Sequence, residues 1–290
     1  MRNKVSVFAA VATMSLAMVS GAHAQQPTGT LLKIKNSGAV ALGYRDASPP
    51  FSYIGQDGKP TGYSLELCLK IADAIKAELG LSSLRIDLVP VTAQTRIPLL
   101  TNGTIDLECG STTHTLTRAQ QVDFLSTTFI TGSRLVVKRS SGFKEVEDLK
   151  GRIVSVGAGS SNERVAEDVN AKNSLGYKIV SAKDLSQAWL ALETDRADAF
   201  LGDDVILHGF VARSKRPDDY IITGRFLSFD PYGIMIRRDE SAFRLIANRT
   251  LARLFRSGEI KEIYQRWFIP IGLQLPPLLG SAFEVQAFPE

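Results

Sequence analysis

A loop rich in hydroxyl groups, followed by an arginine, is the strongest candidate for chemistry in this chain. Gly110 is followed by Ser111, Thr112 and Thr113, and Arg118 comes five positions later. A guanidinium group presents a planar fork of N–H donors that matches the two oxygens of a carboxylate, and Ser or Thr hydroxyls add further donors. The loop therefore predicts a carboxylate site. Taken alone, Arg118 is better explained as an ordinary surface arginine, but the hydroxyl-rich loop before it favours the carboxylate site.

Two other loops carry polar side chains at places where a ligand site would be expected, and a free amino acid would need a carboxylate there for its ammonium group. Asp203 ends a predicted strand, and Ser160 lies in a glycine-rich turn before a predicted helix. In open α/β folds, loops beyond the carboxyl ends of strands form the binding site. Each residue also has a structural interpretation. Ser160 could be only a helix N-cap, and Asp203 or Asp204 could cap the helix that begins near Val205.

An alternation of strands and helices positions these loops. The helix from Leu65 to Leu79 is the clearest, because apolar residues recur at helical spacing on one face and charged residues occupy the other. The predicted strands are 40–44, 85–91, 105–109, 152–156, 178–181, 199–201 and 233–237, and the other predicted helices are 96–100, 162–170, 185–194 and 241–268, interrupted near residue 258. Such alternation predicts parallel sheets flanked by helices. We expect the Pro-rich tail from Pro270 to wrap the surface.

The two sets of elements predict an α/β fold with two Rossmann-like lobes joined by two crossover segments. Lobe one is expected to comprise residues 25–132 and 228–290, and lobe two residues 133–227, with crossings near Thr131 and Phe229. The chain is too long for one small core and suits two lobes.

The N-terminus is predicted to be a signal peptide of residues 1–24. A basic start and an apolar run over residues 5–20 precede the small residues Ala22 and Ala24. We expect cleavage after Ala24 and, because no cysteine follows to carry a lipid, a soluble protein in the periplasm. An uncleaved anchor is the alternative, but the apolar run is short for a membrane span.

Composition argues against several classes of partner. The chain carries 34 basic and 30 acidic residues, and no basic stripe with interleaved aromatic residues, so we expect no nucleic-acid partner. His114 and His208 have no metal-ligand spacing around them, so we expect no metal. Asn162 stands where a dinucleotide loop starting at Gly157 would need its third glycine, so we expect no cofactor.

The two cysteines, Cys68 and Cys109, allow two interpretations. In an oxidising compartment they can form a disulfide that closes a long loop and contributes about 2–4 kcal/mol. The equal alternative is a pair of buried free thiols.

Several segments resemble the periplasmic glutamate/aspartate-binding proteins of ABC transporters. The most specific is 95–113, which ends in Cys-Gly-Ser-Thr-Thr, and residues 43–53 and 179–184 also match. The resemblance spans nearly the whole chain after the signal peptide. It implies the type II periplasmic-binding-protein fold, in which two lobes close on a free amino acid. It also implies a membrane permease as partner, a monomeric state and no enzymatic activity.

The resemblance further implies roles for single residues. Arg118, with Ser111 and Thr113, is expected to bind the α-carboxylate, and Asp203 is expected to pair with the ammonium group. Ser160 is expected to help grip the carboxylate when the lobes close.

The side-chain end of the pocket is expected to contain two more arginines, Arg45 and Arg96, since one arginine cannot serve carboxylates at both ends of a ligand. Rim charges or structural ion pairs are the alternative for both. Phe51 is expected either to stack on the ligand's methylene groups or to pack in the core. Ala93 and Leu185 stand where close relatives have a serine and a histidine, so the pocket could also admit glutamine, asparagine or a bulkier dicarboxylate.

Two other kinds of protein have to be weighed. A dehydratase-like enzyme on the same fold would need a general acid, and only Asp203 is a candidate. The sensing domain of a receptor would carry membrane helices or a signalling module, and neither is recognisable in the sequence.

Overall fold

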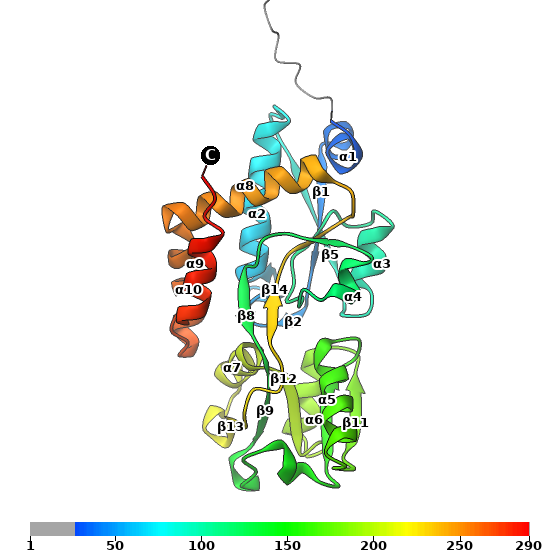
Figure 1. The fold of residues 1–290 in the computed structure, drawn as a ribbon, viewed down its shortest axis with the longest axis vertical. Helices are drawn as coiled ribbons and strands as arrows, with labels where there is room; N and C mark the ends of the chain where they lie inside the picture. Colours follow the sequence, from blue (N-terminus) through cyan, green and yellow to red (C-terminus); the bar gives the residue numbers. More distant parts are fainter. Residues whose placement is uncertain (1–26, 290) are drawn as a thin grey trace, which may run out of the picture.

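The computed structural model describes residues 27–289, so the predicted signal peptide, residues 1–24, lies outside the described residues. Two α/β lobes are stacked end to end, each with a five-stranded sheet flanked by helices (Figure 1). Within residues 27–289, no helix is long and apolar enough to cross a membrane.

The sheet of lobe one has the strand order β5-β1-β6-β15-β7. Its strands are β1 (Ala39–Tyr44), β5 (Arg85–Pro90), β6 (Leu107–Glu108), β7 (Asp123–Phe124) and β15 (Met235–Ile236). β1 pairs in parallel with β5 and β6, whereas β15 is antiparallel to β6 and β7. A small separate sheet consists of β2 (Ala47–Ser48), β3 (Ser52–Ile54) and β4 (Pro60–Thr61).

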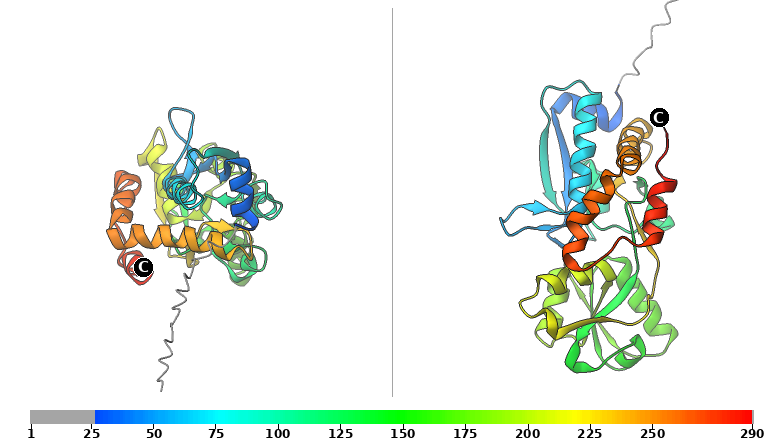
Figure 2. Two further views of the ribbon diagram at one scale, coloured as in Figure 1. Left: turned by 90° about the horizontal axis from the view of Figure 1, so that it is seen from above. Right: turned by 90° about the vertical axis from the view of Figure 1, so that its left-hand side faces the viewer.

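The helices of lobe one come from both ends of the chain. They are α1 (Gly29–Ser37), α2 (Tyr63–Glu78), α3 (Arg96–Thr101), α4 (Leu116–Ala119), α8 (Ser241–Ser257), α9 (Glu259–Phe268), the short 3-10 helix η4 (Ile269–Ile271) and α10 (Pro277–Val285). α2 and α8 pack against each other although they are far apart in sequence (Figure 2). Gly258, with φ of 79°, separates α8 from α9, so the predicted interruption is confirmed.

Lobe two has the strand order β11-β10-β12-β9-β13. Its strands are β9 (Ser133–Lys138), β10 (Ile153–Gly157), β11 (Lys178–Ala182), β12 (Ala199–Asp203) and β13 (Tyr220–Thr223). Its helices are α5 (Ser161–Lys172), α6 (Leu185–Glu193) and α7 (Asp204–Arg213), with the short 3-10 helices η1 (Arg139–Ser141), η2 (Val146–Leu149) and η3 (Pro217–Asp219).

Two short strands carry the chain between the sheets. β8 (Phe129–Thr131) and β14 (Asp230–Tyr232) pair antiparallel, with Asp230 opposite Thr131 (Figure 1). Because both crossings run side by side, they form a two-stranded hinge on which one lobe can turn relative to the other.

The structure differs from the prediction in two respects. The sheets are mixed, since β9 and β13 in lobe two and β15 in lobe one run antiparallel to their neighbours. The reason is that the chain enters and leaves lobe two directly through the hinge, without a crossover helix. In addition, the tail from Pro270, which was expected to wrap the surface, contains the helix α10, which buries Leu279 and Phe283.

A disulfide joins α2 to the end of β6. Cys68 and Cys109 are bonded, with their Cα atoms 6.1 Å apart, so the structure decides between the two interpretations of the cysteines. The bond lies directly before Gly110 and Ser111. It therefore fixes the start of the predicted carboxylate loop to α2.

Candidate functional site

A small closed cavity lies between the lobes, where loops from both sheets meet. Five residues expected from the sequence line it, namely Arg45, Arg96, Ser111, Ser160 and Asp203. The other lining residues are Ala93, Gly157, Ala158, Ser161, Asn162, Lys183, Asp184, Leu185 and Ile206. The cavity follows the carboxyl ends of β1, β10 and β12, as expected of a ligand site in an α/β fold.

Arg45 and Arg96 are almost completely buried, with 4% and 2% of their surface exposed. Burial, followed by the charge of Arg96, lowers the pKa of Arg45 to about 10, and burial lowers the pKa of Arg96. The Nε atom of Arg96 has no hydrogen-bond partner among the described residues. Two buried guanidinium groups that repel each other require an anion, which excludes their interpretation as rim charges.

Glu108 is the buried counter-charge to these arginines, and sequence reasoning missed it. It is 0% exposed, and its charge favours the protonated forms of both Arg45 and Arg96. Thr112 connects the two sides, because its hydroxyl donates to Glu108 Oε2 at 2.7 Å and accepts from Arg96 Nη1. The signal was available in the sequence, since Glu108 is a charged residue between the apolar residues Leu107 and Cys109 of the predicted strand 105–109.

Arg118 and Thr113 lie at the edge of the site and are not part of the cavity lining. The two residues are joined to each other, because Arg118 Nη1 donates to the Thr113 carbonyl oxygen at 2.8 Å. Burial, followed by the charge of Arg96, lowers the pKa of Arg118 to about 10, so Arg118 belongs to the same electrostatic cluster. The Thr113 hydroxyl lies 3.1 Å from the Ser161 hydroxyl of lobe two, which is a direct contact across the cleft.

Asp203 approaches the arginines from lobe two. It is 4% exposed, and its Oδ1 has no hydrogen-bond partner among the described residues. Burial, followed by the charge of Asp230, raises the pKa of Asp203 to about 7, while Tyr232, Asn162 and the charge of Arg118 act in the opposite direction. An unpaired buried carboxylate beside a cavity is suited to receive a cation such as an ammonium group.

Ser160 is the N-cap of α5 in this structure. Its hydroxyl accepts from the Glu163 amide at 3.1 Å and donates to the Gly157 carbonyl at 2.6 Å. The single hydroxyl proton is therefore used within lobe two, although Ser160 lines the cavity. The structural interpretation of Ser160 holds, and a role toward a ligand stays a prediction.

Phe51 does not stack into the cavity, so this expectation has to be corrected. Its side chain is 0% exposed and its ring makes edge contacts with Tyr63, Phe129, Tyr232 and Phe268, with centroids 4.9–6.0 Å away. An apolar ring gains more by joining this aromatic cluster than by facing a cavity of charged groups. Phe51 supports the hinge strands instead, since Phe129 and Tyr232 belong to β8 and β14.

The two positions that depart from the family pattern, Ala93 and Leu185, both line the cavity. A Cβ atom on Gly157 would lie 2.6 Å from Leu185 Cδ2, so the leucine side chain reaches across to the turn before α5. Lys183 and Asp184 beside it were not expected. Asp184 caps α6, because its side chain accepts from the Gln187 amide.

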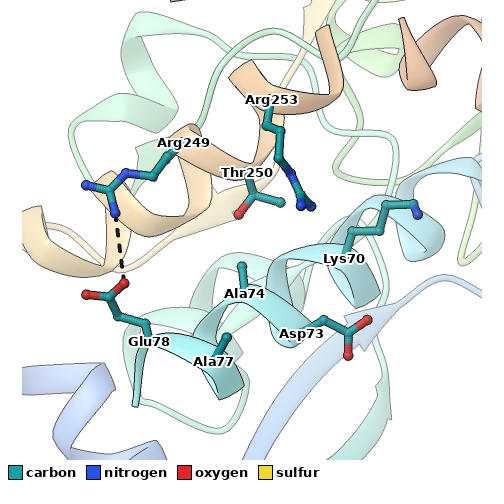
Figure 3. Close-up of a pocket in the computed structure, with 8 residues that line it drawn as sticks. All are labelled: Lys70, Asp73, Ala74, Ala77, Glu78, Arg249, Thr250 and Arg253. Carbon is teal, nitrogen blue, oxygen red and sulfur yellow. Dashed lines mark ion pairs between the residues drawn. The ribbon is translucent and has the colours of Figure 1, made fainter. Parts of the chain in front are cut away.

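A second pocket lies on the outside of lobe one, between α2 and α8 (Figure 3). Its charged groups are already paired in part: Arg249 lies 3.9 Å from Glu78, and Lys70 lies 2.5 Å from Glu259. Its arginines and carboxylates are all exposed. The interlobe cavity is therefore the better site, and among residues 27–289 no group of His, Cys, Asp and Glu side chains is placed to hold a metal ion.

Two lobes on a two-stranded hinge, with a charged cavity between them, define a binding protein of the two-lobed class that closes around a small ligand. The chain belongs to the bacterial extracellular solute-binding proteins, family 3, which it matches over residues 40–270.

Three known proteins illustrate the relationship. The chain is 45% identical to the L-glutamate/L-aspartate-binding protein of Pseudomonas aeruginosa over 87% of this chain and 85% of that protein. It is 40% identical to the glutamate/aspartate import solute-binding protein of Salmonella typhimurium, over 82% and 79% of the two chains. Among solved structures, an ancestral arginine-binding protein bound to glutamine superimposes with a TM-score of 0.71 at 31% identity, over 80% of this chain and 98% of the other.

Proposed function

We propose that this protein captures glutamate or aspartate between its lobes and delivers it to the membrane permease of an ABC importer. The observation that carries the proposal is the pair of buried arginines Arg45 and Arg96 in the lining of one interlobe cavity, with Arg118 close enough for the charge of Arg96 to lower its pKa. Arg118 would bind the α-carboxylate with Ser111 and Thr113, Asp203 would receive the ammonium group, and Arg45 and Arg96 would face the side-chain carboxylate. The names of the two bacterial relatives support the choice of ligand.

The charge of the site favours an acidic amino acid over its amide. Arg45 and Arg96 line the cavity, and the buried carboxylate of Glu108 acts on both of them. Glutamate and aspartate carry a second carboxylate that could face these two guanidinium groups, whereas glutamine and asparagine carry none. Burying an unbalanced charge is costly, so the acidic ligands should bind more tightly.

Glutamine or asparagine is the second candidate, because Ala93 and Leu185 give one wall of the cavity an apolar character. An enzymatic dehydration is less well supported, since Asp203 is committed to the ammonium group in the proposed binding mode. We further propose a monomer located in the periplasm after cleavage at Ala24, with the lobes divided as residues 25–132 plus 228–290 and residues 133–227.

A thermal-shift screen of all free amino acids against ligand-stripped protein tests the proposal. A ligand present at a hundred times its Kd stabilises the folded state by about 2.7 kcal/mol, so glutamate or aspartate should give the largest shift. A larger thermal shift with glutamine or asparagine would show that the ligand is the amide and not the acidic amino acid. Turnover of a cyclic hydroxy acid, with no response to any amino acid, would overturn the binding function.

A further inference from the structure

A second pocket between the lobes lies beside the hinge strands and shares no lining residue with the ligand cavity. We call it the hinge pocket, and its volume is about 370 Å³. One wall comes from lobe two, with Val205 and Phe226, and another comes from the C-terminal tail of lobe one, with Leu278 and Leu279. The hinge strand β8 contributes Ile130. The lining is therefore mainly apolar and belongs to both lobes.

The start of α7 separates the hinge pocket from the ligand cavity. Asp203 and Ile206 line the cavity, whereas Asp204 and Val205 line the hinge pocket. In Figure 1, α7 and α10 lie to the left of the hinge strand β14, and α4 and α5 lie to its right. The lobes turn about the hinge strands, so a rotation that widens the cleft on one side brings the walls of the hinge pocket together on the other.

Several apolar side chains of the hinge pocket are exposed while the lobes are in close contact. Phe226 of lobe two is 59% exposed, Leu278 of lobe one is 58% exposed, and Phe229 of the second crossing segment is 64% exposed. A Cβ atom on Gly132 would lie 2.9 Å from Phe226 Cδ1, so the Phe226 ring lies directly against the first crossing segment. Narrowing the pocket would remove part of this apolar surface from water, which is favourable in proportion to the area buried.

The lobe-one wall of the hinge pocket is firmly attached to its own lobe. In α10, Leu279 is buried, and the Phe283 ring stacks on Phe255 of α8 with centroids 5.1 Å apart. The side-chain amide of Gln286 accepts from the Thr127 amide at 2.7 Å and donates to the Thr127 carbonyl at 3.1 Å, two residues before β8 begins. The wall therefore moves with lobe one and presents a fixed surface to lobe two.

We infer that the hinge pocket stabilises the open form of the protein, because its two apolar walls come together when the cleft opens. Closing the lobes around a ligand separates these walls and returns their surface to water. The hinge pocket thus lowers the population of the closed form in the absence of ligand, and with it the apparent affinity. The inference rests on the proposed function in one respect, since it takes closure as the step that captures the amino acid.

Phe226→Ala and Leu278→Ala test the inference, because both side chains are exposed and neither lines the ligand cavity. Each truncation removes apolar surface that is buried more fully in the open form. The closed form should therefore become more populated, and each variant should bind L-glutamate about two- to fivefold more tightly than the wild type. Isothermal titration calorimetry measures the affinity. Leu245→Ala is the matched control and should bind like the wild type, because Leu245 of α8 is also 58% exposed but lies in a pocket formed by lobe one alone.

A measurement without ligand separates the inference from the proposed function. Lys35→Cys and Lys172→Cys place dyes at exposed positions of α1 in lobe one and α5 in lobe two, and single-molecule energy transfer between them reports how far the lobes are apart. With no amino acid present, the double variant of Phe226→Ala and Leu278→Ala should populate the closed form more than the wild type. An unchanged or smaller closed fraction overturns the inference, as does unchanged or weaker affinity in both single variants. If no amino acid binds to the wild type, the proposed function is wrong, and energy transfer alone decides the inference.

Discussion

At the scale of single residues, the main feature of the site is a group of buried charged side chains. Arg45 and Arg96 are removed from water beside each other, and Glu108 lies among them with Oε1 left without a partner among the described residues. Such groups cost free energy unless they are paired, so a ligand with matching charges would complete their pairing.

The division of labour between arginines can be measured by isothermal titration calorimetry. Arg118→Ala should abolish binding of every amino acid, because all of them present the α-carboxylate. Arg96→Ala should weaken the binding of acidic ligands by about 2–5 kcal/mol, since their side-chain carboxylate loses a buried charge partner. The binding of the amides should be weakened by less. Equal losses of acidic and neutral ligands in Arg96→Ala would contradict this division.

The bridge between Arg96 and Glu108 gives a second prediction. Thr112→Val keeps the shape of the side chain and removes the hydroxyl that joins the two groups. We expect a loss of about 1–3 kcal/mol in the free energy of unfolding, because two buried polar groups lose a partner, together with weaker binding of acidic ligands. Urea denaturation measures the first effect. Thr101→Val, at an exposed position of α3, should leave both quantities unchanged, and a similar change in both variants would refute the bridge.

At the scale of elements, the disulfide and the N-cap of α5 hold the two halves of the site. The disulfide ties the loop after β6 to α2, and Ser160 fixes the turn between β10 and α5. The disulfide and the N-cap both hold the backbone of a loop and do not need to contact a ligand. The loops can therefore keep their amides and hydroxyls directed at the cavity.

Removing the disulfide should therefore affect stability and binding together. The bond joins residues 41 positions apart, for which the loss of chain entropy in the unfolded state corresponds to about 4 kcal/mol. Cys68→Ala with Cys109→Ala should lower the free energy of unfolding by about that amount and weaken ligand binding, because the loop from Gly110 loses its anchor. Reduction of the wild type with dithiothreitol is the parallel measurement. Unchanged affinity in the folded double variant would show that the loop does not need the anchor.

At the scale of the whole molecule, the described conformation has its lobes in close contact. Thr113 meets Ser161 across the cleft. On the side of α7, a Cβ atom on Gly209 would lie 2.6 Å from the carbonyl oxygen of Pro49 in lobe one. Opening of the cleft would separate these groups, so the contacts would contribute to the balance between open and closed forms.

Gly209→Ala should shift that balance toward the open form. The added methyl group clashes with backbone only when the lobes close, at a cost of about 1–2 kcal/mol, which corresponds to a roughly 5–30-fold loss of affinity. Small-angle scattering with saturating ligand should show a larger radius of gyration than for the wild type. Gly280→Ala is the control, because its Cβ would meet only Leu275 Cδ2, at 3.9 Å. Unaltered affinity in Gly209→Ala would mean that ligand binding does not require this contact.

The local pattern of the chain determined much of this protein. Periodicity located α2 and the parallel strands β1, β5, β6, β10, β11 and β12 of the two core sheets, and Gly258 marked the break between α8 and α9. These features depend on neighbours in sequence, and local propensity is sufficient to find them. The residue types of its loop pointed to Arg118, whereas Arg45, Arg96 and Asp203 were assigned through the resemblance to a known family.

Only the tertiary structure decided the rest. The disulfide, the hinge strands and the aromatic burial of Phe51 depend on partners far away in the sequence, so no local signal could settle them. The hydrogen bonds that connect Asn162, Ser133, Ser228 and Asp230 join three separate segments, and they exist only because the tertiary structure brings these side chains together.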